Sequence, residues 1–257
     1  MGSSILVWIL AMSALAADPW TPPENPDPAK ILQEAQADTR NRRYDQALAK
    51  HVWYHRNALA HQPAQSAVRR SFALAYWKQL ADAYPPALLA LLEEREKAEG
   101  KIKAGPALSD AFADFTAINR YLGDEVRTKE MFLELHEKHP DQAMRVYTVA
   151  QPALIKGKEY QVCMSYIDPA ITLQKAAHMF GLNRAMAKEK RFGPSLAAYA
   201  EQKLTNEAAT LVALLVVNGR TAEASSVAFD AKKEWDNAHF RRAIDDALEG
   251  RVPKPWP

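Results

Sequence analysis

The chain has 257 residues, of which 48% are apolar, so it can bury a sizeable core in one large domain or two small ones. Its 33 basic residues nearly balance 31 acidic residues, which gives a formal net charge of +2. This balance argues against a dedicated nucleic-acid surface, since such a surface needs a concentrated cationic stripe. The single cysteine, Cys163, excludes an intrachain disulfide.

The N-terminus carries a short apolar run from Ile5 to Ala17 that ends in a small-x-small pattern. Such a run is typical of a secretory signal peptide, although the preceding MGSS lacks the usual basic residue. The run is well short of the ~20 residues that a helix needs to span a bilayer. We therefore predict a signal peptide over residues 1–17, a periplasmic or secreted protein, and no stable membrane span.

Proline-rich stretches flank the central part of the chain. Residues 18–28, DPWTPPENPDP, contain five prolines in eleven positions, which favours an extended spacer over a helix. Residues 250–257, RVPKPWP after Gly250, contain three more prolines and are expected to lie extended along the surface. The globular part is therefore predicted to cover residues 29–249.

The central part has the composition of an all-α protein. Glycine is scarce, alanine is abundant, and β-branched runs with period-two alternation are nearly absent. Five glycines stand where an apolar helical period ends, and each is predicted to close a helix: Gly100, Gly123, Gly157, Gly181 and Gly219. Several prolines stand at or beside the expected helix beginnings, among them Pro63, Pro140 and Pro169.

The stretch HVWYH places His51 and His55 four residues apart, which puts both imidazoles on one face of a helix. A zinc site would need further ligands, and the general-base glutamate of an HExxH motif is replaced by Val52. His61 falls on a different face. We therefore interpret the pair as partly buried or surface histidines, and no metal or other cofactor is predicted.

A repeat period appears in the middle of the chain, where Gly123 and Gly157 are 34 residues apart and close similar segments. Residues 109–140 place Phe112 and Phe115 in one helix and Phe132 and Leu135 in the next. This pattern resembles the tetratricopeptide repeat, a helix-turn-helix unit of 34 residues. Thr116 and Thr128 depart from it, since the family has small Gly or Ala there.

The resemblance implies a fold of stacked helical pairs. It covers residues 109–166 well and most of 29–249 loosely, whereas residues 170–203 show no clear register. The expected architecture is a right-handed α-solenoid of about six antiparallel helix pairs, in which each pair covers the apolar face of its neighbour.

The resemblance also implies where a partner would bind, because the first helix of each unit lines the concave face in this family. The partner-binding candidates by this register are Tyr76, Gln79, Asp110, Arg120, Tyr121, Tyr147 and Gln151. The positions with which the family grips a terminal carboxylate hold Leu32, Gln36, Ala113 and Ala117. Capture of heat-shock chaperone tails is therefore not expected.

The expected function is a non-enzymatic protein- or peptide-binding scaffold of the cell envelope. The residues indicate neither the partner nor the oligomeric state. One alternative is small-molecule or lipid binding in a groove lined by aromatic residues, for which the candidates are Trp53, Tyr54, Phe72, Tyr76, Trp77 and Tyr84. A less favoured alternative is a metal-binding helical enzyme centred on His51 and His55. A buried Cys163 is expected to be a packing residue and not a nucleophile.

Overall fold

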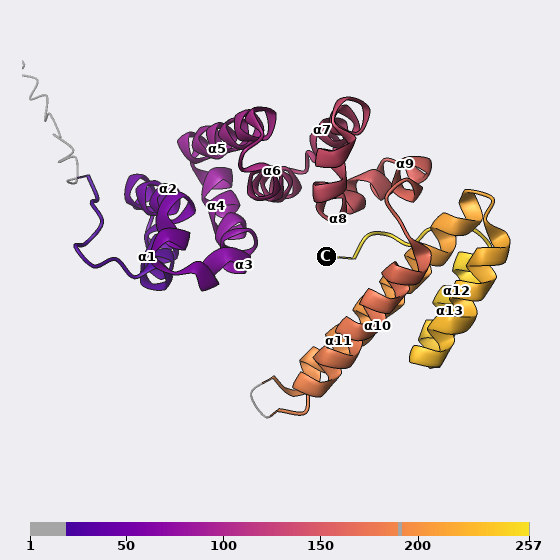
Figure 1. Ribbon diagram of the computed structural model, residues 1–257. Helices are drawn as coiled ribbons and strands as arrows, with labels where there is room; N and C mark the ends of the chain where they lie inside the picture. The colour runs from indigo at the N-terminus through magenta and orange to yellow at the C-terminus, as the bar shows by residue number, and fades with distance from the viewer. Residues whose placement is uncertain (1–18, 190–191, 257) are drawn as a thin grey trace, which may run out of the picture. The chain divides into compact units, whose positions relative to one another are not determined.

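The computed structural model describes residues 19–189 and 192–256. Over these residues the protein is all-α, as the sequence predicted, with thirteen α-helices, one short 3₁₀-helix and no strand (Figure 1). The predicted signal peptide, residues 1–17, lies outside the described residues. The chain divides into two compact units, Met1–Glu93 and Glu94–Pro257, and each is described by itself.

The first unit is built from short helices that follow one another closely. Its elements are α1 (Pro28–Arg40), α2 (Tyr44–His61), η1 (Pro63–Gln65), α3 (Ser66–Arg69), α4 (Phe72–Ala83) and the first part of α5 (Pro85–Ala104). Residues 19–27 contain no helix, and Asp27 caps α1 by accepting hydrogen bonds from the backbone N–H groups of Ala29 and Lys30. α1 packs along α2, and α4 packs against both of them (Figure 1).

The core of the first unit combines apolar and hydrogen-bonded aromatic side chains. Leu32, Tyr54, Ala58 and Ala73 form one buried cluster. The Tyr54 hydroxyl donates to Oε1 of Gln65 at 2.8 Å. The Trp77 indole, also buried, donates to a backbone carbonyl at 3.0 Å. These rings are therefore structural, since their polar atoms are satisfied inside the unit.

A buried ion pair joins the first two helices. Nζ of Lys50 on α2 lies 2.6 Å from Oδ2 of Asp38 on α1, and the two side chains expose only 8% and 4% of their surface. The same carboxylate accepts a hydrogen bond from Nε of Arg43 at 2.8 Å. The buried carboxylate of Asp38 therefore has two cationic partners, Lys50 and Arg43, which offset the cost of removing it from water.

The second unit begins with a group of four helices. They are α6 (Leu108–Leu122), α7 (Glu125–Lys138), α8 (Pro140–Lys156) and α9 (Tyr160–Met164). Gly123 ends α6 in the left-handed conformation with φ 72°, which confirms the helix end predicted there. α8 packs against both α6 and α7. Phe112, Phe115 and Phe132 lie in the shared core, together with the end of α5.

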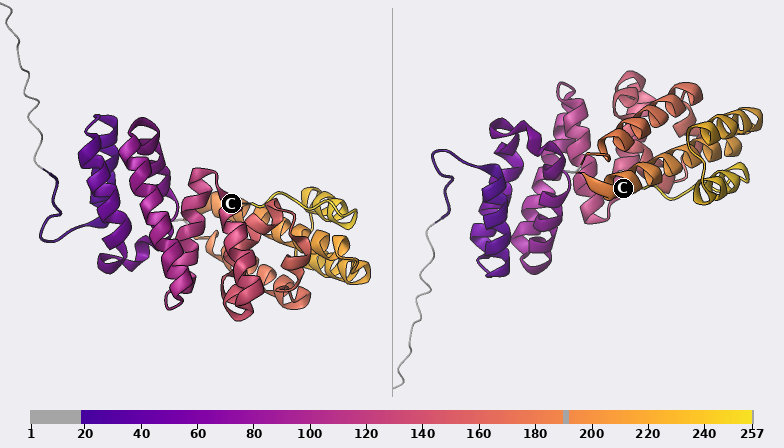
Figure 2. Two further views of the ribbon diagram at one scale, coloured as in Figure 1. Left: turned by 90° about the horizontal axis from the view of Figure 1, so that it is seen from above. Right: turned by 90° about the horizontal axis from the view of Figure 1, so that it is seen from below.

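A second group of four helices completes this unit. They are α10 (Pro169–Met186), α11 (Gly193–Val217), α12 (Thr221–Glu234) and α13 (Ala238–Leu248). α11 is the centre of the group, because it packs against α10, α12 and α13 and buries residues along most of its length. Both views of Figure 2 show these orange and yellow helices lying side by side.

The two groups of the second unit share their core. Leu214 of α11 belongs to the cluster formed by α6–α9, and Val252 packs against both clusters. The Asn218 side chain donates to the backbone carbonyl of Tyr160 at 3.2 Å. Beyond α13 the chain has no helix over residues 251–256, and Trp256 packs against Tyr199 of α11 with ring centroids 5.0 Å apart.

Two helix ends predicted from glycine are wrong. Gly100 lies inside α5, which continues to Ala104, and Gly181 lies inside α10, which continues to Met186. A single glycine costs a helix only about 1 kcal/mol, and around Gly100 the buried Ala98 and Ile102 offset that cost. The residues of α10 that follow Gly181 are exposed or half-buried. Among the described residues no helix has both the length and the apolar character needed to cross a bilayer.

Candidate functional site

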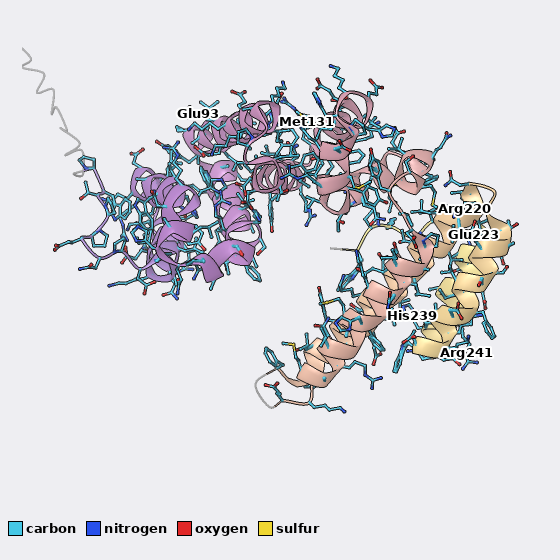
Figure 3. The ribbon with its side chains drawn as sticks, viewed as in Figure 1. Glu93, Met131, Arg220, Glu223, His239 and Arg241 are labelled. Atoms are coloured by element: carbon cyan, nitrogen blue, oxygen red, sulfur yellow. The ribbon has the colours of Figure 1, made fainter. Side chains whose placement is uncertain are left out.

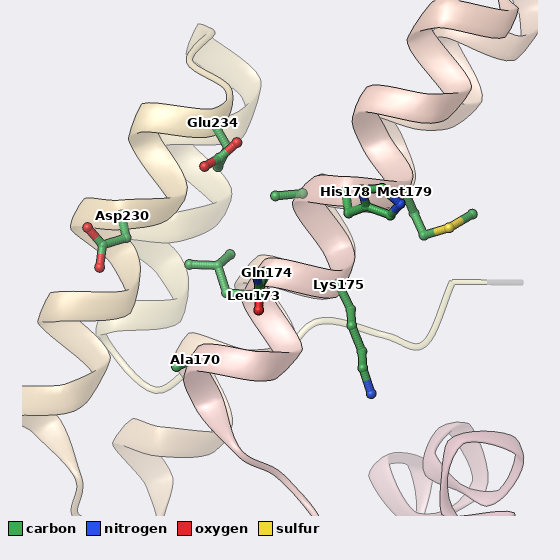
Figure 4. A pocket seen from close by; sticks show the side chains of 9 residues that line it. Ala170, Leu173, Gln174, Lys175, His178, Met179, Asp230 and Glu234 are labelled. Carbon is green, nitrogen blue, oxygen red and sulfur yellow. The ribbon is translucent and has the colours of Figure 1, made fainter.

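A groove with a volume of about 830 Å³ lies between α10 and α12 in the second unit (Figure 4). The wall formed by α10 carries Ala170, Leu173, Gln174, Lys175, Ala177, His178 and Met179. The wall formed by α12 carries Asp230 and Glu234. Both helices therefore contribute polar side chains to the rim above an apolar floor.

The groove exists because α10 and α12 both pack on α11. α10 begins at a proline after Asp168, whose carboxylate accepts a hydrogen bond from the backbone N–H of Ile171 at 3.0 Å. It buries Leu173, Ala176 and Phe180 against α11. Most of the side chains that α12 buries against α11 are alanines. Large side chains therefore anchor α10 on α11, whereas small ones let α12 approach it closely.

Charged side chains stand at the groove on both helices, and α12 contributes the acidic ones. Asp230 and Glu234 are one helical turn apart on α12, so their carboxylates lie on one face. Asp230 accepts a hydrogen bond from Lys233 at 2.8 Å. α10 carries Lys175 and His178, and the Lys175 side chain projects from α10 away from α12 (Figure 4). Within the part of the chain that the structure describes, neither Lys175 nor Glu234 forms an ion pair.

Four large apolar side chains of α10 are exposed, and of these only Met179 lines the groove. Ile171, Met179, Leu182 and Met186 expose 47%, 43%, 45% and 38% of their surface. Their spacing of eight, three and four residues puts them on one side of the helix. Lys175 stands four residues from both Ile171 and Met179, so this outward face of α10 combines apolar side chains with a charge.

An aromatic pair lies beside the groove, one residue beyond Met179 and Glu234. Phe180 and Trp235 meet edge to face with ring centroids 5.4 Å apart. The guanidinium of Arg184 lies 4.7 Å from the centroid of the Trp235 ring. At the N-terminus of α12, the guanidinium of Arg220 donates two hydrogen bonds to the carboxylate of Glu223 (Figure 3).

The partner-binding candidates from the sequence are spread over three helices. Tyr76 and Gln79 lie on α4 in the first unit, half-buried and exposed respectively. In the second unit the candidates on α6 are the exposed Asp110 and Arg120 and the half-buried Tyr121. None of them lines the α10–α12 groove.

The two candidates on α8 interact with each other. The side chain of Gln151 donates to the hydroxyl of Tyr147 at 3.0 Å. Tyr147 is buried, stacks on Tyr166 with centroids 5.1 Å apart, and has its pKa raised by burial. Tyr147 therefore belongs to an internal aromatic cluster and offers little surface to a partner.

The sequence analysis missed α10 and α12 because residues 170–203 gave no repeat register. One signal was present in the sequence: Leu173, Ala176 and Phe180 recur at helical spacing and form the buried face of α10.

The HVWYH motif forms a packing site in the first unit. The rings of His51 and His55 lie 6.0 Å and 5.8 Å from Trp77, measured between centroids. Nε of Arg69 donates to the backbone carbonyl of His55 at 2.6 Å, and Nη2 lies 3.4 Å from its Nε2. A guanidinium beside the imidazole opposes binding of a metal cation there. Over the described residues no group of three or more metal-ligating side chains occurs.

Cys163 is a buried packing residue in the core of the second unit. Burial raises the pKa of its thiol to about 11, so the group is protonated at neutral pH. Because the thiolate is the nucleophilic form, the surroundings of Cys163 suppress its reactivity.

These features define an all-α protein whose helices pack mainly against helices close to them in sequence. No family model, curated protein or solved structure matches the chain.

Proposed function

We propose that this protein is a scaffold of stacked helical pairs that binds a protein or peptide partner along the first helices of its pairs and performs no chemistry itself. The proposed pairs are α1/α2, α4/α5, α6/α7, α8/α9, α10/α11 and α12/α13, similar to tetratricopeptide repeats in a right-handed solenoid. The apolar segment Ile5–Ala17 supports a place in the periplasm or outside the cell.

Part of the packing within each unit supports this pairing, although α4 makes few contacts with α5 and α13 packs more extensively on α11 than on α12. α4 contacts both α1 and α2, α8 contacts both α6 and α7, and α12 contacts both α10 and α11. In each case the first helix of one proposed pair covers both helices of the pair before it. Repeated contacts of this kind, local in sequence, are what a stacked repeat requires.

The observation that carries the proposal is the position of the groove. It lies between α10 and α12, which are the first helices of two successive proposed pairs. The resemblance to tetratricopeptide repeats implied partner contacts on first helices. The groove also combines an apolar floor with a few polar groups, as binding sites do.

Photocrosslinking tests the proposal. A photoreactive phenylalanine analogue is placed at His178, which lines the groove, and in a matched variant at His239, an exposed histidine on α13 (Figure 3). We expect illumination in the native envelope to give a discrete protein adduct from position 178 and none from position 239. The same adducts from both positions, or none from position 178, would contradict the proposal.

Small-molecule or lipid binding remains a second candidate because the groove volume lies in the range of about 300 to 1,000 Å³ that ligand pockets occupy. The aromatic residues expected to line a ligand groove lie in the first unit and not at this groove. Two of them, Tyr54 and Trp77, are buried and hydrogen-bonded there. Native mass spectrometry of the purified protein separates the two candidates. A bound small molecule that is lost in His178→Trp would favour the second.

A further inference from the structure

The C-terminal tail, residues 251–256, covers part of the surface of α11 in the second unit. The backbone carbonyl of Lys254 accepts a hydrogen bond from Nδ2 of Asn206 at 3.0 Å. The ring of Trp256 packs against Tyr199 with centroids 5.0 Å apart. An extended segment is therefore already seated on the face of α11 that carries Tyr199 and Asn206.

The spacing of these two contacts suits an extended peptide. Tyr199 and Asn206 are seven residues apart on α11, so they lie on one side of the helix about 10 Å from each other. From Pro253 to Trp256 an extended proline-rich chain spans about 9 Å. The residue before each proline is also restricted to extended backbone. The tail therefore reaches both contacts without folding.

The contacts define which segment the surface recognises. Pro253 and Pro255 have no backbone N–H, so they bring no unpaired donor to the helix, and both are half-buried. The side chain of Lys254 is exposed, so only its carbonyl is recognised. Trp256 supplies the aromatic ring. This chemistry corresponds to the pattern Pro-x-Pro-Trp, in which x is any residue.

The outer part of the tail can leave α11 without disturbing the core. Val252 packs against both clusters of buried residues in this unit. Beyond it the hydrogen bond of Asn206 lies at the surface, and Tyr199 still exposes 42% of its surface beside Trp256. The last residues of a chain open most readily. Residues 253–256 are therefore exchangeable while Val252 remains in place.

We propose that the face of α11 carrying Tyr199 and Asn206 is a binding site for an extended Pro-x-Pro-Trp segment of a partner protein, which the tail of this chain occupies in cis. The partner segment displaces residues 253–256 and places its tryptophan on Tyr199. Its prolines hold it extended before binding, which reduces the entropy lost on binding. Because the tail is tethered, it competes at a high effective concentration and limits binding to partners that outcompete it.

Fluorescence anisotropy with the labelled peptide Pro-Lys-Pro-Trp-Pro tests this competition in the full-length protein. Trp256→Ala removes the ring of the cis tail, so this variant should bind the peptide roughly fivefold more tightly than wild type. Lys254→Ala keeps the carbonyl and the ring, and should match wild type. A peptide with alanine in place of tryptophan should bind neither protein. Equal affinity of wild type and Trp256→Ala, or binding to neither, would overturn the inference.

Further substitutions in the Trp256→Ala protein locate the site. Tyr199→Ala should abolish peptide binding, whereas Tyr199→Phe keeps the ring and should retain it. Phe229→Ala removes an exposed ring of α12 and should leave the affinity unchanged. Far-ultraviolet circular dichroism identifies any variant that has unfolded. Binding that survives in a folded Tyr199→Ala protein, or that is lost equally in Phe229→Ala, would overturn the assignment to α11.

Sedimentation separates the remaining occupant of this face. A wild-type dimer that Trp256→Ala converts to a monomer would place the tail on α11 of a second copy, and would overturn the cis assignment. We expect wild type and Trp256→Ala to sediment alike. Crosslinking at position 178 tests a different surface, since that residue lies on α10 in the groove. Failure at either surface is therefore recognised independently of the other.

Discussion

The imidazole of His51 and the indole of Trp77 lie nearly parallel in the core of the first unit, with ring centroids 6.0 Å apart and planes inclined by 21°. His51 is buried, and its Nε2 has no hydrogen-bond partner in the part of the chain that the structure describes. Burial lowers the pKa of the imidazole from 6.5 to about 4. The folded protein therefore holds His51 in its neutral form at neutral pH.

The first prediction concerns the pH dependence of stability. Between pH 6.5 and about 4 the unfolded chain binds a proton at His51 and the folded chain does not. The free energy of unfolding therefore falls as the pH is lowered through this window, and is fully retained above it. At pH 5 the loss from His51 is about 2 kcal/mol relative to pH 7.5.

Urea unfolding at the two pH values measures this effect. In His51→Leu the difference between pH 7.5 and pH 5 should shrink by about 2 kcal/mol. His61→Gln changes an exposed histidine on the same helix and should behave as wild type. A His51→Leu protein with an unaltered pH dependence would show that His51 is not the group responsible.

The second prediction compares the two sides of the buried ion pair. Asp38→Ala leaves the Lys50 ammonium buried with only Glu34, at 3.3 Å, as an acidic neighbour. Lys50→Met leaves Asp38 paired with Arg43. Because an unpaired buried charge is costly, Asp38→Ala should destabilise the protein by about 3 kcal/mol and Lys50→Met by clearly less.

Chemical denaturation of the two variants gives the comparison. Arg43→Ala is the third variant of the set, because it removes the partly exposed ion-pair partner of Asp38. If Lys50→Met were the most damaging of the three, the carboxylate would depend on Lys50 alone.

The third prediction compares a glycine in the left-handed conformation with a glycine inside an α-helix. Gly123 has φ 72°, where an alanine side chain is strained, whereas Gly181 lies in the middle of α10 with nothing within 4 Å of an added Cβ. Gly123→Ala should destabilise the protein and Gly181→Ala should stabilise it, each by about 1 kcal/mol. Thermal unfolding should therefore shift in opposite directions, and a shift of the same sign in both would contradict the assignment.

The fourth prediction concerns the single thiol. With a pKa of about 11, Cys163 is almost entirely protonated at pH 8 and also shielded by the core. Iodoacetamide should therefore label it far more slowly in the native protein than in urea. Mass spectrometry follows the reaction directly. Rapid native labelling would mean that α8 and α9 open often enough to expose the thiol.

The sequence predicted the features that depend on local chemistry. Gly123 closes α6 because only glycine adopts its left-handed conformation at low cost, and Pro140 begins α8 because its missing N–H is not needed there. His51 and His55 are buried more completely than the partly buried or surface positions that the sequence analysis expected.

The features that the sequence did not predict depend on tertiary packing. Gly100 failed as a helix end because Ile102 continues α5 into the core, whereas α10 continues past Gly181 although Phe180 is its last buried residue. Tyr147 was expected to face a partner, but Phe132 and Tyr166 cover it. The groove depends on two helices meeting α11, and residues distant in sequence decide where they meet.

The position of Val252 links the two cores of the second unit. Its side chain packs against the core around α6–α9 and also against the core around α10–α13. A chain that lacks this valine loses one apolar contact in each of the two cores, so its removal should weaken both cores together.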